Sequence, residues 1–340
     1  MSKLINNKFK LTFYFLLMFS TTLAISSTSW MSMWMSLEIN MMAFIPLMMN
    51  IPLNLSTNAM IKYFLTQAAS SSMLIISLMM LKMYNTPMNL SLIYTLMTSS
   101  LLFKLGAAPF HWWMPSMINE ITWINCLILL TWQKIIPLYM INIMEFSSMM
   151  INLCASLSAI LGSISGLNQN SLKLILTYSS ITHTGWMLHT TNLSKTLTTM
   201  YLMIYTLLIL SITMICNTLN MNYLSQMFMM NNKTPMMKMM MTMSFLSMSG
   251  LPPFISFTPK IFTLMMMINN SMLSESMILL TSTLISLKFY MNPLITSLML
   301  NYYNTKSTLL NMKFNELNLL IIINLSINLI LIKYMNQIMI

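Results

Sequence analysis

Five ionisable side chains lie deep inside hydrophobic stretches of this 340-residue sequence, in which charged residues are otherwise rare. They are Glu38, Lys104, Lys134, His183 and Lys260. Carboxylates, amines and imidazoles can give and take protons, and a charge at the centre of a bilayer costs about 2.5–3.5 kcal/mol. The glutamate and the three lysines, if all were charged and unpaired, would together cost on the order of 10 kcal/mol. Mutual pairing and internal water would offset this cost, and they would also make a route for ions.

Each of these residues also has a structural interpretation. Glu38 could be solvated at a headgroup, and Lys104 could extend its amine toward the membrane surface. Lys260 could mark the end of a short helix, and His183 could hydrogen-bond to a neighbouring helix. Lys134 is the strongest candidate for chemistry because it lies near the middle of its hydrophobic stretch.

Other polar residues lie nearer the ends of the hydrophobic stretches. We interpret His111, His189 and Lys173 as contacts to the headgroup region. Glu275 and Glu316 begin late helices, where a negative charge in the first turn is favourable. No further role is assigned to them.

Two similar breaks interrupt the hydrophobic sequence. The pattern G-x-x-P-F-x4-P begins at Gly106 and again at Gly250, with Lys104 just before the first copy and Lys260 directly after the second. Proline cannot donate a backbone hydrogen bond, so the helix should open at each pattern. Freed carbonyl groups must meet protein or water, which predicts a polar cavity or tight burial. Two broken helices with adjacent amines indicate a transporter built from two related halves.

The composition is typical of a protein that lies almost entirely in a membrane. The chain is 57% hydrophobic and 6% charged, with a mean hydropathy of +0.72. A bilayer is spanned by about 20 apolar residues, and we count about eleven such stretches. They cover roughly 10–29, 31–49, 58–81, 90–114, 120–142, 148–166, 171–190, 196–219, 236–264, 272–299 and 317–336. The segment 220–233 is predicted to be a loop. The sequence therefore predicts an all-α, polytopic membrane protein.

Several classes of function lack the residues that they need. The net charge of +11 comes from dispersed lysines without a basic stripe, so nucleic-acid binding is not expected. No glycine-rich phosphate loop is present, which excludes a nucleotide site of that type. Cys126, Cys154 and Cys216 occur singly, so we expect neither disulfides nor a metal site. Redox centres have no ligand set on this chain.

Residue usage indicates an organellar gene. All 16 basic residues are lysine, all five acids are glutamate, and methionine occurs 47 times. An AT-rich genome in which ATA encodes methionine, as in animal mitochondria, explains this bias. Methionine also serves as flexible apolar filler.

Six runs of residues resemble the antiporter-like subunits of respiratory complex I, and among them the mitochondrially encoded subunit 2 family of NADH dehydrogenase (ubiquinone). The similarity is colinear over about residues 10–300. The runs are WMSLEINMMAFIP from Trp34, IKYFLTQA from Ile61, KLGAAPFHWWMP from Lys104, LTWQKIIP from Leu130, YSSITHTGW from Tyr178, and SGLPPF from Ser249 followed by Pro259 and Lys260.

The resemblance implies a multi-pass protein of the mitochondrial inner membrane, in the shortened animal form without the first three helices of bacterial relatives. Its function would be proton translocation as a core subunit of NADH:ubiquinone oxidoreductase. Its implied partners are lipids and other membrane-arm subunits, including neighbouring antiporter-like and small core subunits. FMN, iron-sulfur clusters and ubiquinone would belong to other subunits, with no cofactor or redox site on this chain.

The resemblance also implies a domain plan and roles for the five residues. Residues 1–340 would form one transmembrane domain with inverted half-repeats over roughly 31–165 and 168–300, and a C-terminal helix over roughly 317–336. The family's counterpart of Glu38 pairs with that of Lys104. The counterpart of Lys134 is the central relay, that of Lys260 lies on the terminal side, and His183 would lie between them.

Our mechanistic hypothesis is that changes in the contact between Glu38 and Lys104 alter the electric field at Lys134. Lys134 would then switch between holding and releasing a proton. Moving one charge against 100 mV costs about 2.3 kcal/mol, a cost that pairing and burial can offset. Two alternatives use the same residues: a self-contained cation/proton antiporter, and a structural spacer with a dry interior around Lys134.

Overall fold

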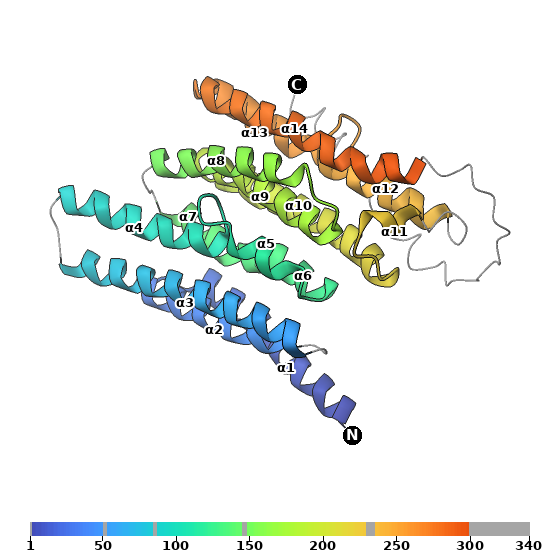
Figure 1. Ribbon diagram of the computed structural model, residues 1–340. Helices are drawn as coiled ribbons and strands as arrows, with labels where there is room; N and C mark the ends of the chain where they lie inside the picture. Colours follow the sequence, from blue (N-terminus) through green and yellow to red (C-terminus); the bar gives the residue numbers. More distant parts are fainter. Residues whose placement is uncertain (1, 50–52, 84–86, 145–147, 229–234, 299–340) are drawn as a thin grey trace.

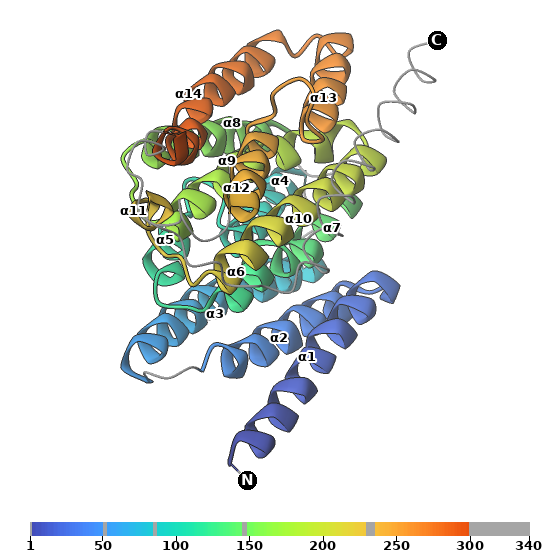
Figure 2. The ribbon, with the colours of Figure 1, turned by 90° about the vertical axis from the view of Figure 1, so that its right-hand side faces the viewer.

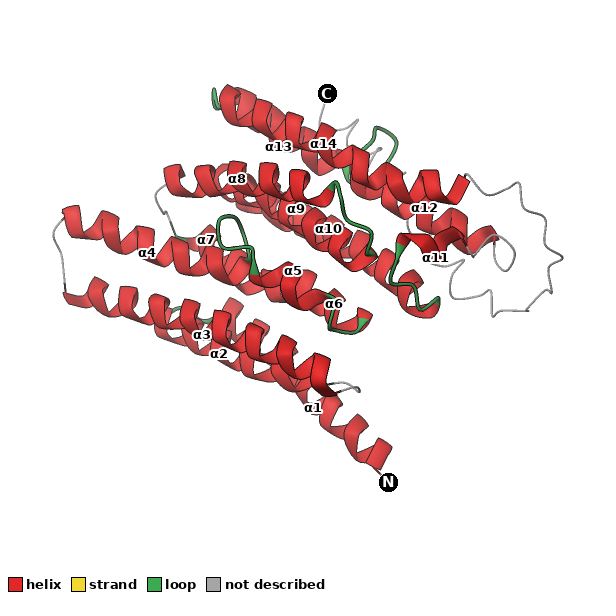
Figure 3. Cartoon of the chain, in the orientation of Figure 1, coloured by secondary structure: helices red, strands yellow, loops and turns green. Residues whose placement is uncertain are grey.

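The computed structural model describes residues 2–49, 53–83, 87–144, 148–228 and 235–298. All regular elements in these ranges are helices (Figure 3), apart from one isolated β-bridge between Ser171 and Tyr223. The predicted all-α class is therefore confirmed. The expected C-terminal helix over 317–336 lies outside the described residues.

In Figure 1 most helices run in a similar direction, and the bundle extends from α1–α3 on one side of the molecule to α13 and α14 on the other (Figures 1 and 2). In chain order they are α1 (Ser2–Ser26), α2 (Trp30–Leu47), α3 (Leu53–Met83), α4 (Pro87–Leu105), α5 (Trp113–Ile118), α6 (Trp123–Leu130), the 3-10 turn η1 (Trp132–Lys134), α7 (Ile135–Ile143), α8 (Ser148–Gly166), α9 (Leu172–Leu193), α10 (Lys195–Thr218), α11 (Leu224–Phe228), α12 (Pro235–Ser249), α13 (Phe257–Asn269) and α14 (Leu273–Leu298). Most predicted spans overlap a single helix, whereas 90–114, 120–142 and 236–264 are each divided between shorter elements.

Six stretches in the described part of the chain are long and apolar enough to cross a membrane. They are Phe9–Ser26, Ser56–Met83, Trp123–Ile143, Met149–Gly166, Lys195–Thr218 and Leu273–Ile295. The expected count of about eleven spans is not confirmed. Polar residues lower the hydropathy of α2 and α9, glycine and proline divide the expected spans 90–114 and 236–264, and the span 317–336 lies outside the described residues. The outer surface is apolar, as lipid requires: Phe15, Met203 and Leu284 are 68%, 66% and 67% exposed.

The interior contains many serine and threonine side chains, and their hydroxyl groups are satisfied locally. The hydroxyl of Ser158 donates to the Ala155 carbonyl at 2.8 Å, and that of Thr177 donates to the Leu174 carbonyl at 2.8 Å. Such bonds to the preceding helical turn let a polar residue enter the interior at little cost. The interior can therefore be polar while the surface remains apolar.

Both predicted breaks are confirmed. Helix α4 ends one residue before Gly106, and α12 ends one residue before Gly250; the two glycines have φ values of +66° and +80°. A side chain at Gly106 would also lie 2.7 Å from the Met114 methyl group. Glycine is suited to both positions because it adopts positive φ without a steric penalty.

A third irregularity was not predicted from the sequence. The expected span 120–142 is divided by η1, which places Lys134 in a tightened turn between α6 and α7. Pro137 explains the division, because its ring clashes with the carbonyl of residue 133 and removes a helical hydrogen bond. The predicted loop 220–233 was also incomplete. It contains the short helix α11. The side chain of Gln226 in this helix accepts a hydrogen bond from the backbone N–H of Asn222, which precedes the helix, at 2.6 Å.

Candidate functional site

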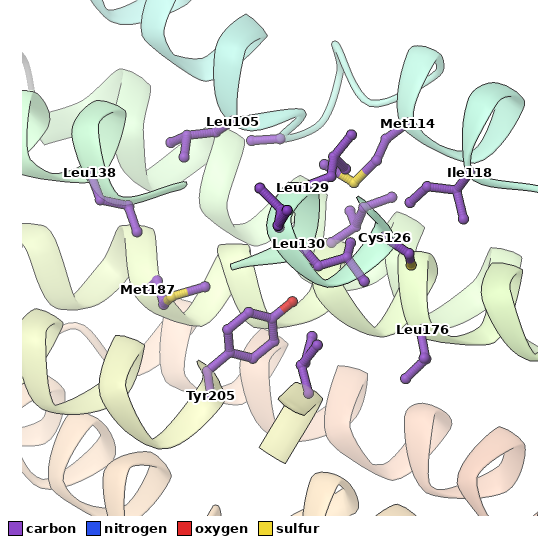
Figure 4. Close-up of a cluster of buried hydrophobic side chains, with 14 of the residues drawn as sticks. Leu105, Met114, Ile118, Cys126, Leu129, Leu130, Leu138, Leu176, Met187 and Tyr205 are labelled. Carbon is purple, nitrogen blue, oxygen red and sulfur yellow. The ribbon is translucent and has the colours of Figure 1, made fainter. Parts of the chain in front are cut away.

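Lys134 lies at the centre of the bundle, where its side chain is 2% exposed. Its ammonium donates to the Tyr205 hydroxyl at 3.1 Å and to the Ser180 carbonyl at 3.3 Å. The ammonium also lies 4.7 Å from the centre of the Tyr205 ring. Figure 4 shows Tyr205 of α10 within a cluster of buried apolar side chains around α6. A proton at Lys134 is therefore held by a hydroxyl, a carbonyl and a ring face in apolar surroundings.

Lys104 and Lys134 line one small cavity between α2, α3, α4 and η1. The space open to the centre of a water molecule is about 20 Å³, which accommodates roughly one water. The remaining polar lining consists of Asn40, Tyr63, Gln67 and Gln133. The sequence left a polar cavity or tight burial open beside the first break, and the structure has a small polar cavity that contains Lys104.

Glu38 lies within electrostatic range of both Lys104 and Tyr63. It does not form a direct ion pair with Lys104, because the ion pairs within 4.0 Å among the described residues involve other side chains. The Oε1 atom of Glu38 is buried and has no hydrogen-bond partner. The two residues are therefore electrostatic neighbours rather than a closed salt bridge.

A bridge of neutral side chains leads from the Glu38 region to Lys134. The Tyr63 hydroxyl donates to Oε1 of Gln133 at 3.3 Å, and Nε2 of Gln133 donates to Oδ1 of Asn40 at 3.3 Å. Gln133 directly precedes Lys134 in η1. The bridge ties α2 and α3 to the irregular turn that carries the central amine.

His183 lies on the other side of Lys134. Its Nδ1 atom is 2.8 Å from the Tyr201 hydroxyl, and its ring centre is 5.3 Å from that of Tyr205, the hydroxyl partner of Lys134. His183 also lies within electrostatic range of both Lys134 and Lys260.

Lys260 is buried in the first turn of α13, at 7% exposure. Its ammonium donates to the Ser249 carbonyl at 3.0 Å and lies 6.0 Å from the Trp186 ring centre. A Cβ atom at Gly250 would lie only 2.6 Å from this ammonium. The second break therefore supplies both the carbonyl and the space that hold the Lys260 amine. Lys260 and His183 line one narrow gap, which has no space for a water molecule and is lined also by Thr182, Trp186, Ser282, Thr283, Ser286 and Tyr290.

The structure thus brings the five sequence-predicted residues into one row across the bundle. Sequence reasoning missed the neutral groups between them, which are Tyr63, Gln67, Gln133, Tyr201, Tyr205 and Tyr290. The sequence spacing could have indicated some of these groups. Two pairs are each four residues apart and share a helix face: Tyr63 and Gln67 in α3, and Tyr201 and Tyr205 in α10.

Three side chains interpreted as headgroup contacts are buried instead. His111 is 5% exposed, and His189 is 1% exposed and packs beside Glu275. Lys173 is 9% exposed, and its ammonium donates to the Ile121 carbonyl at 2.6 Å. The interpretation was wrong because neighbouring helices cover the ends of these spans.

Metal ligation finds no support in the described part of the chain, where no three His, Cys, Asp or Glu side chains group closely enough to hold an ion. Cys126, Cys154 and Cys216 are buried and free.

Comparison with known families and sequences gives close matches. The family model for the transmembrane NADH:quinone oxidoreductase/Mrp antiporter proteins matches residues 27–286. The NADH-ubiquinone oxidoreductase chain 2 of Anopheles gambiae is 40% identical over 325 residues, which cover 93% of this chain and 92% of that protein. The chain 2 protein of Locusta migratoria is 36% identical over 314 residues, 92% of each chain.

Solved structures share the fold at low sequence identity. A chain of respiratory complex I from Thermus thermophilus, solved with bound aureothin, superposes with a TM-score of 0.82 at 19% identity and covers 94% of this chain and 78% of its own. A chain of the Mrp complex from Dietzia sp. superposes with a TM-score of 0.77 at 14% identity, over 86% of this chain and 61% of its own.

Proposed function

This chain belongs to the NADH-ubiquinone oxidoreductase chain 2 family, and from that membership we propose that it conducts protons along the row from Glu38 to Lys260. It is a multi-pass subunit of the proton-translocating NADH-ubiquinone oxidoreductase of the mitochondrial inner membrane. Its partners are the other subunits of the membrane arm. Electron transfer takes place elsewhere in that enzyme, where FMN, iron-sulfur clusters and ubiquinone are held by other subunits.

The observation that carries the proposal is the setting of Lys134. Its buried amine shares a polar cavity with Lys104 on one side and reaches His183 through Tyr205 on the other. Hydroxyl and imidazole groups can both accept and donate protons. Lys134 is thus the central relay, with Lys104 before it and Lys260 after it.

Glu38 acts as the switch. Because it is an electrostatic neighbour of Lys104 without a closed ion pair, a small movement of α2 changes their interaction substantially. A stronger attraction holds the Lys104 charge near Glu38, and a weaker one returns that charge to the cavity that it shares with Lys134. Lys134 responds by holding or releasing its proton.

The domain plan is part of the proposal. Half-repeats over roughly 31–165 and 168–300 each contain a helix that is broken at a glycine of positive φ, with a lysine beside the break. This correspondence supports two related halves within one transmembrane domain.

The decisive experiment replaces Lys134 with methionine in the assembled complex and measures protons pumped per electron. The expected result is a lower ratio, while NADH oxidation measured with the membrane potential dissipated is retained. Lys82→Met is the matched control, because Lys82 is an exposed lysine in the last turn of α3. An unchanged ratio in a correctly assembled Lys134→Met complex would leave a structural spacer as the better reading. Ion exchange by the purified chain alone would favour a self-contained antiporter.

A further inference from the structure

A second polar cluster lies outside the row from Glu38 to Lys260, where α8, α9 and α14 meet. Nδ1 of His189 in α9 is 3.5 Å from Oε2 of Glu275 in α14. Nδ2 of Asn192 donates to Oδ1 of Asn152 at 2.5 Å, and the Asn152 side chain lies beside Glu275. Two amides from α8 and α9 therefore lie next to the imidazole and the carboxylate.

The imidazole and the carboxylate differ in their access to the surroundings. The His189 side chain is 1% exposed, whereas that of Glu275 is 24% exposed. Nε2 of His189 and Oε2 of Glu275 are both buried without a hydrogen-bond partner. Buried polar atoms are nearly always paired, and an unpaired one calls for an explanation such as stored strain, a bound water or ion, or a role in catalysis or proton transfer. Inside the protein, the Nε2 atom of His189 has no hydrogen-bond partner. At the surface, the Glu275 side chain is partly exposed.

The cluster lies between the interior amines and one face of the bundle. His189 is six residues beyond His183, which is about 9 Å nearer the end of α9. Lys260 is nine residues before the end of α13, about 13 Å from the turn that leads into α14. Glu275 lies in the first turn of α14, immediately after this turn.

One side of α14 carries residues of both the cluster and the Lys260 site. Glu275, Ser282, Ser286 and Tyr290 are separated by seven, four and four residues and therefore share a helix face. The last three line the same narrow gap as Lys260 and His183. Leu279, which is fully buried, lies between Glu275 and Ser282 on that face and separates the two ends of the path.

We propose that His189 and Glu275 form the point at which the proton path of this chain opens to the membrane face where α9 ends and α14 begins. The inference rests on the proposed function, and it adds two proton-transfer residues to the row. A proton that leaves Lys260 binds at Nε2 of His189. The resulting imidazolium gives its Nδ1 proton to the Glu275 carboxylate, which releases it to water. Water then relays the remaining ring proton from Nε2 back to Nδ1, so one proton crosses and no electron moves.

The test is made in the assembled complex with Glu275→Gln and His189→Gln. Each variant keeps a polar side chain of similar size and removes the titratable group. We expect each to lower the number of protons pumped per electron by the same amount as Lys134→Met. Glu275→Asp should restore most of the wild-type ratio, and formate added to Glu275→Ala should restore part of it. A purely structural cluster would not respond to formate.

Lys195→Gln is the matched control, because Lys195 is an exposed charged residue in the first turn of α10, just beyond the end of α9. If Lys134→Met lowers the ratio while Glu275→Gln and His189→Gln pump normally, the exit is overturned and the proposed function stands. If none of them lowers it, the proposed function falls as well.

Should the glutamine variants not assemble, dicyclohexylcarbodiimide labelling of the wild-type complex decides. Label at Glu275 that grows with the loss of pumping supports the exit, and pumping loss without label there overturns it.

Discussion

The hydroxyl group of Tyr205 lies 3.1 Å from the ammonium of Lys134, and the face of the same ring lies 4.7 Å from it. One tyrosine thus contacts the buried amine in two ways, through a hydrogen bond and through a cation–π interaction. The ring also neighbours His183, with 5.3 Å between the ring centres. Tyr205 therefore contacts both residues, Lys134 through its hydroxyl group and His183 through its ring.

Replacing Tyr205 with phenylalanine separates these two contributions. The ring contact with Lys134 is kept, while a hydrogen bond to a charged group, worth about 1.5–3 kcal/mol, is lost. If that bond acts in the proton transfer, the rate of pumping should fall about 10- to 100-fold. The measurement is the initial rate of proton uptake or release during NADH oxidation, with Tyr223→Phe, at an exposed tyrosine, as the control. A normal rate in Tyr205→Phe would show that the hydroxyl is not on the path.

The relation between Glu38 and Lys104 predicts coupled effects. Because the two residues interact electrostatically without direct contact, Glu38→Gln and Lys104→Met should each lower pumping, and the double variant should be no worse than the more severe single one. We expect a coupling of about 1 kcal/mol or more. The quantity to measure is the pumping rate in all four forms of the complex. Strictly additive losses would show that the pair does not act as a switch.

The helix ends and both glycine breaks could be predicted from the sequence because their causes are local. Proline removes a backbone donor wherever it occurs, and a glycine at positive φ is marked by the residues around it. The effect of Pro137 on the turn at Lys134 was equally local, and it was missed. The break at η1 contains no glycine, and the long apolar stretch around it was therefore read as one continuous helix.

The partners of the buried amines could not be predicted, because they come from distant parts of the chain. Lys134 and Tyr205 are 71 residues apart in the sequence, and Tyr63 and Gln133 are 70 apart. Periodicity shows which side of a helix is polar but not which helix it faces. The same limit led to the wrong interpretation of His189, since only the packing of α14 brings Glu275 beside it.

The ion pair between Lys62 and Glu120 offers a contrasting prediction. The Lys62 ammonium lies 3.1 Å from Oε1 of Glu120 and 3.1 Å from the Ser116 carbonyl, and the two charged side chains are 42% and 19% exposed. Such partly exposed pairs contribute about 0–1 kcal/mol. Glu120→Gln should therefore reduce the heat resistance of the complex only slightly and leave the proton-to-electron ratio unchanged. A marked fall in that ratio would place this pair on the proton path.

The position of Gly250 makes the second break a sensitive test of the Lys260 site. An alanine there would be strained at φ +80°, and its Cβ atom would lie 2.6 Å from the Lys260 ammonium, which must then leave the Ser249 carbonyl. The backbone strain alone costs roughly 1–2 kcal/mol. Gly106→Ala has similar strain at φ +66°, but its Cβ would meet the flexible methyl end of Met114. We therefore expect similar losses of heat resistance in the two variants and a clearly larger loss of pumping in Gly250→Ala. Equal pumping losses, measured per assembled complex, would show that strain at a break, rather than displacement of the Lys260 amine, determines the effect.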